Sequence, residues 1–143
     1  MKSKKLISVM IALCMLLSLG ITGITATAFA ADDPIVIGVI SPNTGTLAAY
    51  GTGIVTGVQL AAEEINAAGG ILGRQVELVI TDDQGDPTEC LNAFNSLVAK
   101  GVTLIIGSAT SGCTSAITDA ANEEEVCILC PTGTADSLTT EDD

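Results

Sequence analysis

Short apolar runs alternate with helix-like segments between residues 34 and 131. Four runs have the length and composition of strands covered on both faces: "PIVIGVI" (34–40), "RQVELVITDD" (74–83), "VTLIIG" (102–107) and "VCILCP" (126–131). Between them, apolar positions recur every three or four residues, as in helices with one buried side. Strict strand–helix alternation predicts an α/β fold, namely a doubly wound parallel sheet with right-handed crossovers and helices on both faces.

Local signals define the ends of the predicted helices. The first, over about 52–67, carries an inward stripe formed by Ile54, Val58, Ala61 and Ile65, and Gly69-Gly70 ends it. The segment Asp86-Pro87-Thr88-Glu89 is typical of a helix start, with Asp86 as the N-cap. Ser111 or a neighbour caps the third helix, which runs to about residue 124.

Residues 1–30 have the pattern of a secretory signal peptide. Three lysines precede an apolar run that is too short to span a membrane, and the segment ends in Ala28-Phe29-Ala30, which signal peptidase accepts. Cys14 follows Leu13 rather than the small residue of a lipoprotein signal, so no lipid anchor is expected. We therefore expect secretion across the inner membrane and a periplasmic or extracellular mature chain of residues 31–143.

The composition of that mature chain excludes several classes of function. Arg74 and Lys100 are its only basic residues against all 17 acidic residues, so its formal charge is −15 (2 − 17). Such a charge disfavours binding to nucleic acid or to anionic membranes. The chain contains no histidine, which removes His-based catalytic triads and most zinc sites.

Motifs for cofactors and metals are weak or missing. No predicted strand is followed by G-x-G-x-x-G, and G-K-[ST] does not occur, so no nucleotide cofactor is expected. Asp82, Asp83 and Asp86 carry oxygen ligands for a cation, but a strand end and a helix cap explain them more simply. We therefore expect neither an enzyme nor a metal site.

Small polar residues after three predicted strands mark a candidate binding site. They lie in "SPNTG" and at Tyr50 after the first strand, in "GSATSGCTSA" (107–116) after the third, and in "PTGT" (131–134) after the fourth. Ligands of open parallel sheets bind beyond the carboxyl ends of the strands. A helix that starts near Gly112 would direct free N–H groups there and favour a carboxylate. Ser111 either adds a hydrogen bond to the ligand or only caps its own helix.

The four cysteines of the mature chain fall into two pairs. Cys127 and Cys130 lie on one predicted strand, where three residues span ~10 Å, which is too far for a bridge; we expect buried core thiols. Cys90 and Cys113 each lie in the first turn of a predicted helix. From this placement, a bridge in an oxidising compartment and two free thiols are both open.

Several segments together resemble the start of the periplasmic leucine/isoleucine/valine-binding proteins and their amide- and urea-binding relatives. The most specific are "GVQLAAEEINAAGGILGRQVEL", "DDQGDP", "IIGSATSG" and "PTGTADSLT", which with their surroundings cover nearly all of 34–139. That family comprises type I solute-binding proteins of ABC importers, whose two lobes close on an amino-acid-like ligand. The resemblance implies that residues 31–143 are a partial N-terminal lobe with strand order 2-1-3-4. It also implies non-catalytic binding of branched-chain or related amino acids, or amides, and cooperation with membrane permease subunits.

The resemblance implies roles for four residues. Ser111 and Thr134 match the serine and threonine that hold the ligand carboxylate. The backbone carbonyl of Thr132 matches the one that accepts from the ammonium group, and Tyr50 matches a tyrosine that lines the pocket.

The resemblance also bears on the cysteines. Relatives carry one cysteine just before the ligand-binding serine and another in the "DDxxDP" turn, where this chain has Thr110 and Gly85. Cys113 and Cys90 lie a few residues further on, which implies that a bridge has been relocated rather than lost.

Other functions stay open from the sequence. The family's proteins are much longer than this chain, so the resemblance implies a fragment whose exposed fourth strand favours self-association. The alternatives are an amino-acid or amide sensor domain, a small exported Rossmann-like enzyme, and a truncated product without function.

Overall fold

The computed structural model describes residues 33–139, which form a four-stranded parallel sheet in the order β2-β1-β3-β4. The elements in chain order are β1 (Ile35–Ser41), α2 (Ala48–Ala67), β2 (Val76–Asp82), α3 (Pro87–Val98), β3 (Leu104–Ile106), α4 (Ser111–Glu123), β4 (Cys127–Leu129) and the 3-10 helix η1 (Asp136–Leu138). The predicted strand order and parallel pairing are confirmed. The predicted signal peptide lies outside the described residues. Within 33–139, no helix is long and apolar enough to cross a membrane.

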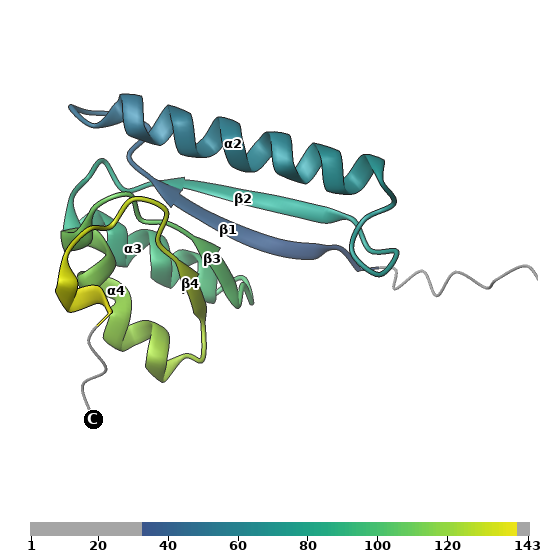
Figure 1. The fold of residues 1–143 in the computed structure, drawn as a ribbon. Helices are drawn as coiled ribbons and strands as arrows, with labels where there is room; N and C mark the ends of the chain where they lie inside the picture. The colour runs from purple at the N-terminus through teal and green to yellow at the C-terminus, as the bar shows by residue number, and fades with distance from the viewer. Residues whose placement is uncertain (1–32, 140–143) are drawn as a thin grey trace, which may run out of the picture. The chain divides into compact units, whose positions relative to one another are not determined.

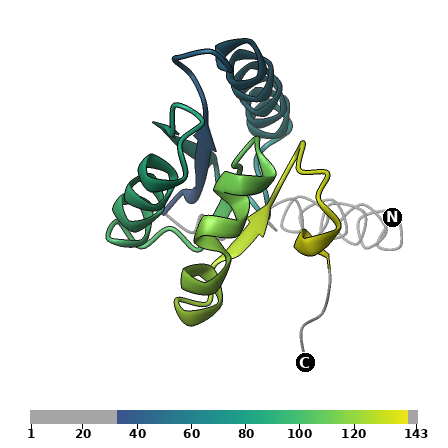
Figure 2. The same cartoon turned by 90° about the vertical axis from the view of Figure 1, so that its left-hand side faces the viewer.

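Helices cover both faces of the sheet, as predicted. Helix α2 lies along one face over β1 and β2, whereas α3 and α4 pack together on the other face (Figures 1 and 2). Each crossover therefore returns the chain to the same end of the sheet. This arrangement brings the loops that follow β1, β2, β3 and β4 to one edge.

The main core lies between the sheet and the pair α3–α4. Phe94 and Leu97 of α3, Ile105 of β3 and Ile117 of α4 are fully buried there. Gly38 of β1 admits this packing, because a Cβ atom at that position would lie 2.7 Å from Cδ1 of Leu97.

The other face of the sheet is less completely covered than the apolar pattern predicts. In the predicted inward stripe of α2, Ile54 and Val58 are half-buried, but Ala61 and Ile65 are exposed. Leu129 of β4 is 60% exposed. An apolar cavity of about 310 Å³ lies between α2 and the strands, and its lining includes Val58, Ile65 and Leu129. The reason is that, within 33–139, α2 covers only part of this face.

The predicted start of the second helix is confirmed. The Asp86 carboxylate accepts hydrogen bonds from the N–H groups of Thr88 and Glu89, and Pro87 is the first residue of α3. These contacts are local, which is why the sequence alone predicts them.

The carboxylate of Asp82 organises the loop between β1 and α2. It accepts hydrogen bonds from the Thr44 hydroxyl at 2.6 Å and from the N–H groups of Asn43 at 2.8 Å and Gln84 at 2.9 Å. Partial burial acts to raise the pKa of Asp82, but these hydrogen bonds outweigh it and hold the pKa below its ordinary value of 3.8.

This arrangement predicts a pH dependence for Asp82→Asn. The variant should lose about 1 kcal/mol or less of unfolding free energy at neutral pH, because the carboxylate is close to solvent. Since the folded-state pKa is depressed, the stabilisation is present above 3.8 and disappears as the pH falls through the lower folded value. Urea unfolding of both chains across acidic pH should show the difference vanish. A difference that persists in acid would contradict this role.

Candidate ligand-binding site

Residues that follow β1, β3 and β4 line an open cavity of about 430 Å³ at the carboxyl edge of the sheet. Its lining residues are Leu47, Tyr50, Ala109, Thr110, Ser111, Thr132 and Thr134. The structure therefore brings together all four residues predicted to contact a ligand, which lie up to 84 positions apart (Tyr50 to Thr134). Their roles in binding stay predictions. Sequence analysis missed Leu47, although its place three residues before Tyr50 puts it on the same side of the α2 start.

The N-terminus of α4 lies at this cavity, because Thr110 and Ser111 line it. Thr110, rather than Ser111, is the N-cap, since its hydroxyl accepts from the Cys113 N–H at 3.2 Å. The N–H groups of Ser111 and Gly112 occupy the first two helical positions, where a helix offers them no acceptor. The positive end of the helix dipole adds to their preference for an anion.

The Ser111 hydroxyl is positioned by the loop after β4. Its Oγ accepts hydrogen bonds from the N–H groups of Thr134 at 3.1 Å and Ala135 at 3.2 Å. A hydroxyl can accept two hydrogen bonds and donate one. Because both acceptor positions are filled by the backbone, the O–H is left to donate to a ligand.

The loop after β4 is held against the loop after β3 by a second contact. The Thr132 hydroxyl donates to the backbone carbonyl of Ala109. Thr132 itself lines the cavity, and its backbone carbonyl is an acceptor group. The cavity thus carries donors at Ser111 and an acceptor at Thr132.

Tyr50 forms an open wall of the cavity from the first turn of α2. Its side chain is 61% exposed. The neighbouring Gly51 allows this placement, because a Cβ atom there would lie 2.1 Å from the carbonyl oxygen of Pro42. The helix can therefore lie directly against the loop after β1.

The cavity lining contains no carboxylate and no basic side chain. Recognition of an anionic group would rest on N–H groups, hydroxyls and the helix dipole. No lining residue has the combination of nucleophile and base that covalent catalysis requires.

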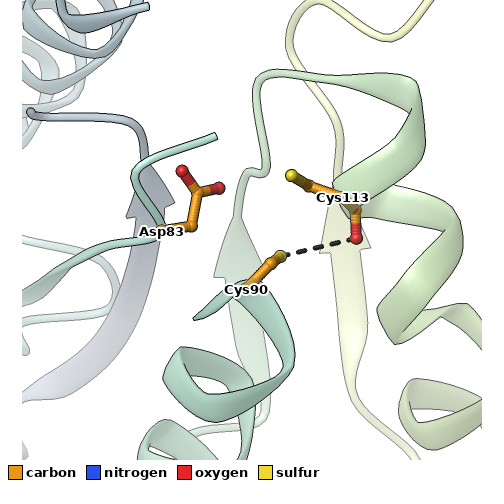
Figure 3. Close-up of side chains that lie close together, drawn as sticks. All are labelled: Asp83, Cys90 and Cys113. Carbon is orange, nitrogen blue, oxygen red and sulfur yellow. Dashed lines mark hydrogen bonds between the residues drawn. The ribbon is translucent and has the colours of Figure 1, made fainter. Parts of the chain in front are cut away.

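The cysteine predictions have mixed outcomes. Cys127 is exposed and Cys130 half-buried, so the expectation that both are buried core thiols is wrong. Strand β4 ends at Leu129, so Cys130 lies beyond the strand that was predicted to hold both. Cys90 and Cys113 are fully buried free thiols, and Sγ of Cys90 lies 3.4 Å from the Cys113 carbonyl oxygen (Figure 3). A bridge between them stays a prediction.

The fold agrees with comparisons to known proteins. Residues 34–142 match the family model described as periplasmic binding protein, and the chain belongs to this family. It is 42% identical over 120 residues to the Leu/Ile/Val-binding protein BraC3 of Rhizobium johnstonii, covering 82% of this chain and 33% of that protein. It is 37% identical over 122 residues to the leucine-, isoleucine-, valine-, threonine-, and alanine-binding protein of Pseudomonas aeruginosa, covering 85% and 32%.

Solved structures give the same result. The branched-chain amino acid transporter substrate binding protein LivJ of Streptococcus pneumoniae, in complex with isoleucine, matches with a TM-score of 0.72 and 42% identity, over 75% of this chain and 31% of that one. A leucine binding protein, LivK, of Thermotoga maritima matches with a TM-score of 0.69 and 34% identity, over 75% and 30%. The fold is that of type I periplasmic binding proteins. The chain spans about a third of the length of the curated relatives it matches.

Proposed function

We propose that this chain is part of the extracytoplasmic solute-binding component of an ABC importer and that it binds a branched-chain or related amino acid without catalysis. The observation that carries the proposal is the Ser111 hydroxyl, whose acceptor positions are both filled by backbone N–H groups. The hydroxyl can therefore still donate one hydrogen bond, and a carboxylate oxygen of the ligand would accept it. Relatives named as binders of leucine, isoleucine and valine supply the ligand class.

Different residues of the cavity contact different parts of the ligand. The Ser111 hydroxyl, the N–H groups of Ser111 and Gly112, and the Thr134 hydroxyl hold the carboxylate. The carbonyl of Thr132 accepts from the ammonium group. Leu47 and Tyr50 contact the apolar side chain.

The partners and location follow from the same proposal. A binding protein of an importer delivers its ligand to membrane permease subunits and works outside the cytoplasm. The signal-peptide pattern of residues 1–30 supports a periplasmic or extracellular place. The strongly acidic composition supports a small-molecule ligand rather than nucleic acid.

Ser111→Ala and Thr134→Ala test the site, in a full-length protein that carries this lobe. Each variant should bind leucine about ten- to a hundredfold more weakly, because a hydrogen bond to a charged group contributes roughly 1.5–3 kcal/mol. Tyr50→Ala should also weaken binding, through lost contact with the apolar side chain. Calorimetry measures the three affinities.

Two controls make the ligand test specific. Ser115→Ala removes an exposed hydroxyl from the same helix and should leave the affinity unchanged. Leucinamide, which lacks the carboxylate, should bind weakly to all chains. Its affinity should differ little between wild type and Ser111→Ala. Unchanged leucine affinity in both hydroxyl variants would remove these residues from the site.

We also propose that the chain self-associates through the partly uncovered face of the sheet. Leu129 and Ile65 expose apolar surface beside the cavity between α2 and the strands, and β4 is an edge strand. A second copy that pairs there would bury this surface.

Light scattering on residues 31–143 tests self-association. We expect dimers or larger species, strengthened by added salt because the copies repel each other through a charge of −15 (2 − 17). Leu129→Glu should yield monomers. Leu72→Glu, at a turn residue that is 92% exposed, should not. A wild-type monomer at high salt would refute the proposal.

A further inference from the structure

A cluster of metal-ligand side chains lies outside the ligand cavity. Asp83 follows β2, Cys90 lies in the first turn of α3, and Cys113 lies in the first turn of α4. One carboxylate oxygen and the two sulfurs all lie within 4.8 Å of one another. Figure 3 shows the three side chains converging from three separate elements.

The cluster is fully buried, which makes the carboxylate unusual. Asp83, Cys90 and Cys113 each have no exposed surface. Asp83 accepts hydrogen bonds from the Gly85 N–H at 2.9 Å and from the Ser108 hydroxyl at 2.5 Å, but no basic side chain of the described residues pairs with it. A buried carboxylate without a counter-charge is costly, and a bound cation would offset that cost.

The donor set selects the kind of cation. Two sulfurs and one carboxylate oxygen suit zinc and similar thiophilic ions, whereas calcium and magnesium require oxygen ligands. Zinc–sulfur bonds of about 2.3 Å place two thiolates of a tetrahedral site about 3.8 Å apart. The observed spacing of at most 4.8 Å is therefore within about 1 Å of a ligating geometry.

We propose that Asp83, Cys90 and Cys113 form a binding site for a thiophilic divalent cation of the zinc class in the reduced chain. The Ser108 hydroxyl orients the Asp83 carboxylate through its hydrogen bond, as outer groups of metal sites do. The bound ion connects the end of β2 to the first turns of α3 and α4. The site shares no residue with the ligand cavity, so it goes beyond the proposed function and stands independently of it.

Binding exchanges protons for the metal. Each of the two thiols releases its proton to solvent, and the two thiolates and the carboxylate then form bonds to the cation. Affinity for the cation should consequently increase with pH.

A cobalt titration tests the site. The 143-residue chain is unfolded, reduced with a phosphine and refolded without oxygen in the presence of Co²⁺, because the buried ligands require metal during folding. We expect one Co²⁺ per chain, with the thiolate-to-cobalt absorption of a tetrahedral site, and displacement of cobalt by Zn²⁺. The triple variant Cys14→Ser/Cys127→Ser/Cys130→Ser is the matched control and should retain the full signal.

Variants of the three metal-ligating residues complete the test. Cys90→Ser and Cys113→Ser should lose the thiolate-to-cobalt absorption, and Asp83→Asn should weaken binding at least about tenfold. Circular dichroism shows whether each variant folds; the isosteric Asp83→Asn keeps the test decisive if a cysteine variant does not. The proposal is overturned if folded, reduced wild type binds no cobalt, if Cys90→Ser keeps the signal, or if the triple control loses it.

Discussion

Phe94→Ala should lower the free energy of unfolding by about 3–5 kcal/mol, as expected for an aromatic residue removed from a core. Phe94 has no exposed surface and lies where α3 meets the sheet and α4. A typical domain has only about 5–15 kcal/mol of net stability. The substitution should therefore move the urea midpoint sharply toward zero or unfold the chain outright.

An exposed apolar residue provides the control for this result. Leu60 of α2 is 55% exposed, and Leu60→Ala should change the unfolding free energy by no more than about 0.5 kcal/mol. Unfolding of both variants, followed by circular dichroism in urea, compares them directly. Equal effects of the two substitutions would mean that the α3 side of the sheet is not the main core.

Features that depend on neighbouring residues could be predicted from the sequence. Apolar runs of strand length alternating with helix periods predict the parallel sheet, and the position of Asp86 before Pro87 predicts the start of α3. These signals are local, so no tertiary contact is needed to interpret them. The three polar loops could likewise be assigned to one edge, because parallel strands end on the same side.

The role of Ser111 could not be resolved from local sequence. Thr110 and Ser111 both carry short hydroxyl side chains that can cap a helix. The choice depends on Thr134 and Ala135, whose N–H groups occupy the Ser111 oxygen from a loop 23 and 24 residues away. Thr110 is then the residue left to cap α4.

The extent of burial also depends on distant structure. The helix stripe that includes Ile65 and the strand run that includes Cys127 both predict burial, yet both residues are exposed. The apolar pattern of the sequence predicts which surface can be buried, but it does not identify the element that covers that surface. The closeness of Cys90 and Cys113 likewise depends on tertiary structure, because it follows from the packing of α3 against α4 rather than from their spacing along the chain.

Oxidation of Cys90 and Cys113 to a disulfide should raise the free energy of unfolding by about 3 kcal/mol, provided that the bridge is unstrained. The bridge would close the loop of residues 90–113 and so restrict the unfolded chain. The two sulfurs lie within 4.8 Å of each other, and the Cys90 thiol has only to turn from the Cys113 carbonyl toward the Cys113 sulfur. In the reaction each thiol loses a proton, and the two electrons reduce oxidised glutathione to two thiols.

The bridge and the metal site use the same sulfurs, so each excludes the other, and their tests must be kept apart. Metal-free chain is refolded with oxidised and reduced glutathione, and peptides are mapped without reductant. We expect a Cys90–Cys113 link, no Cys127–Cys130 link, and a stability gain that reductant abolishes. Cys127→Ser/Cys130→Ser should behave like wild type, and zinc-loaded chain should resist oxidation. Separate labelling of both thiols after refolding would contradict the bridge. It would leave the metal site to its own test, because two sulfurs that are too far apart for a disulfide can still bind one ion.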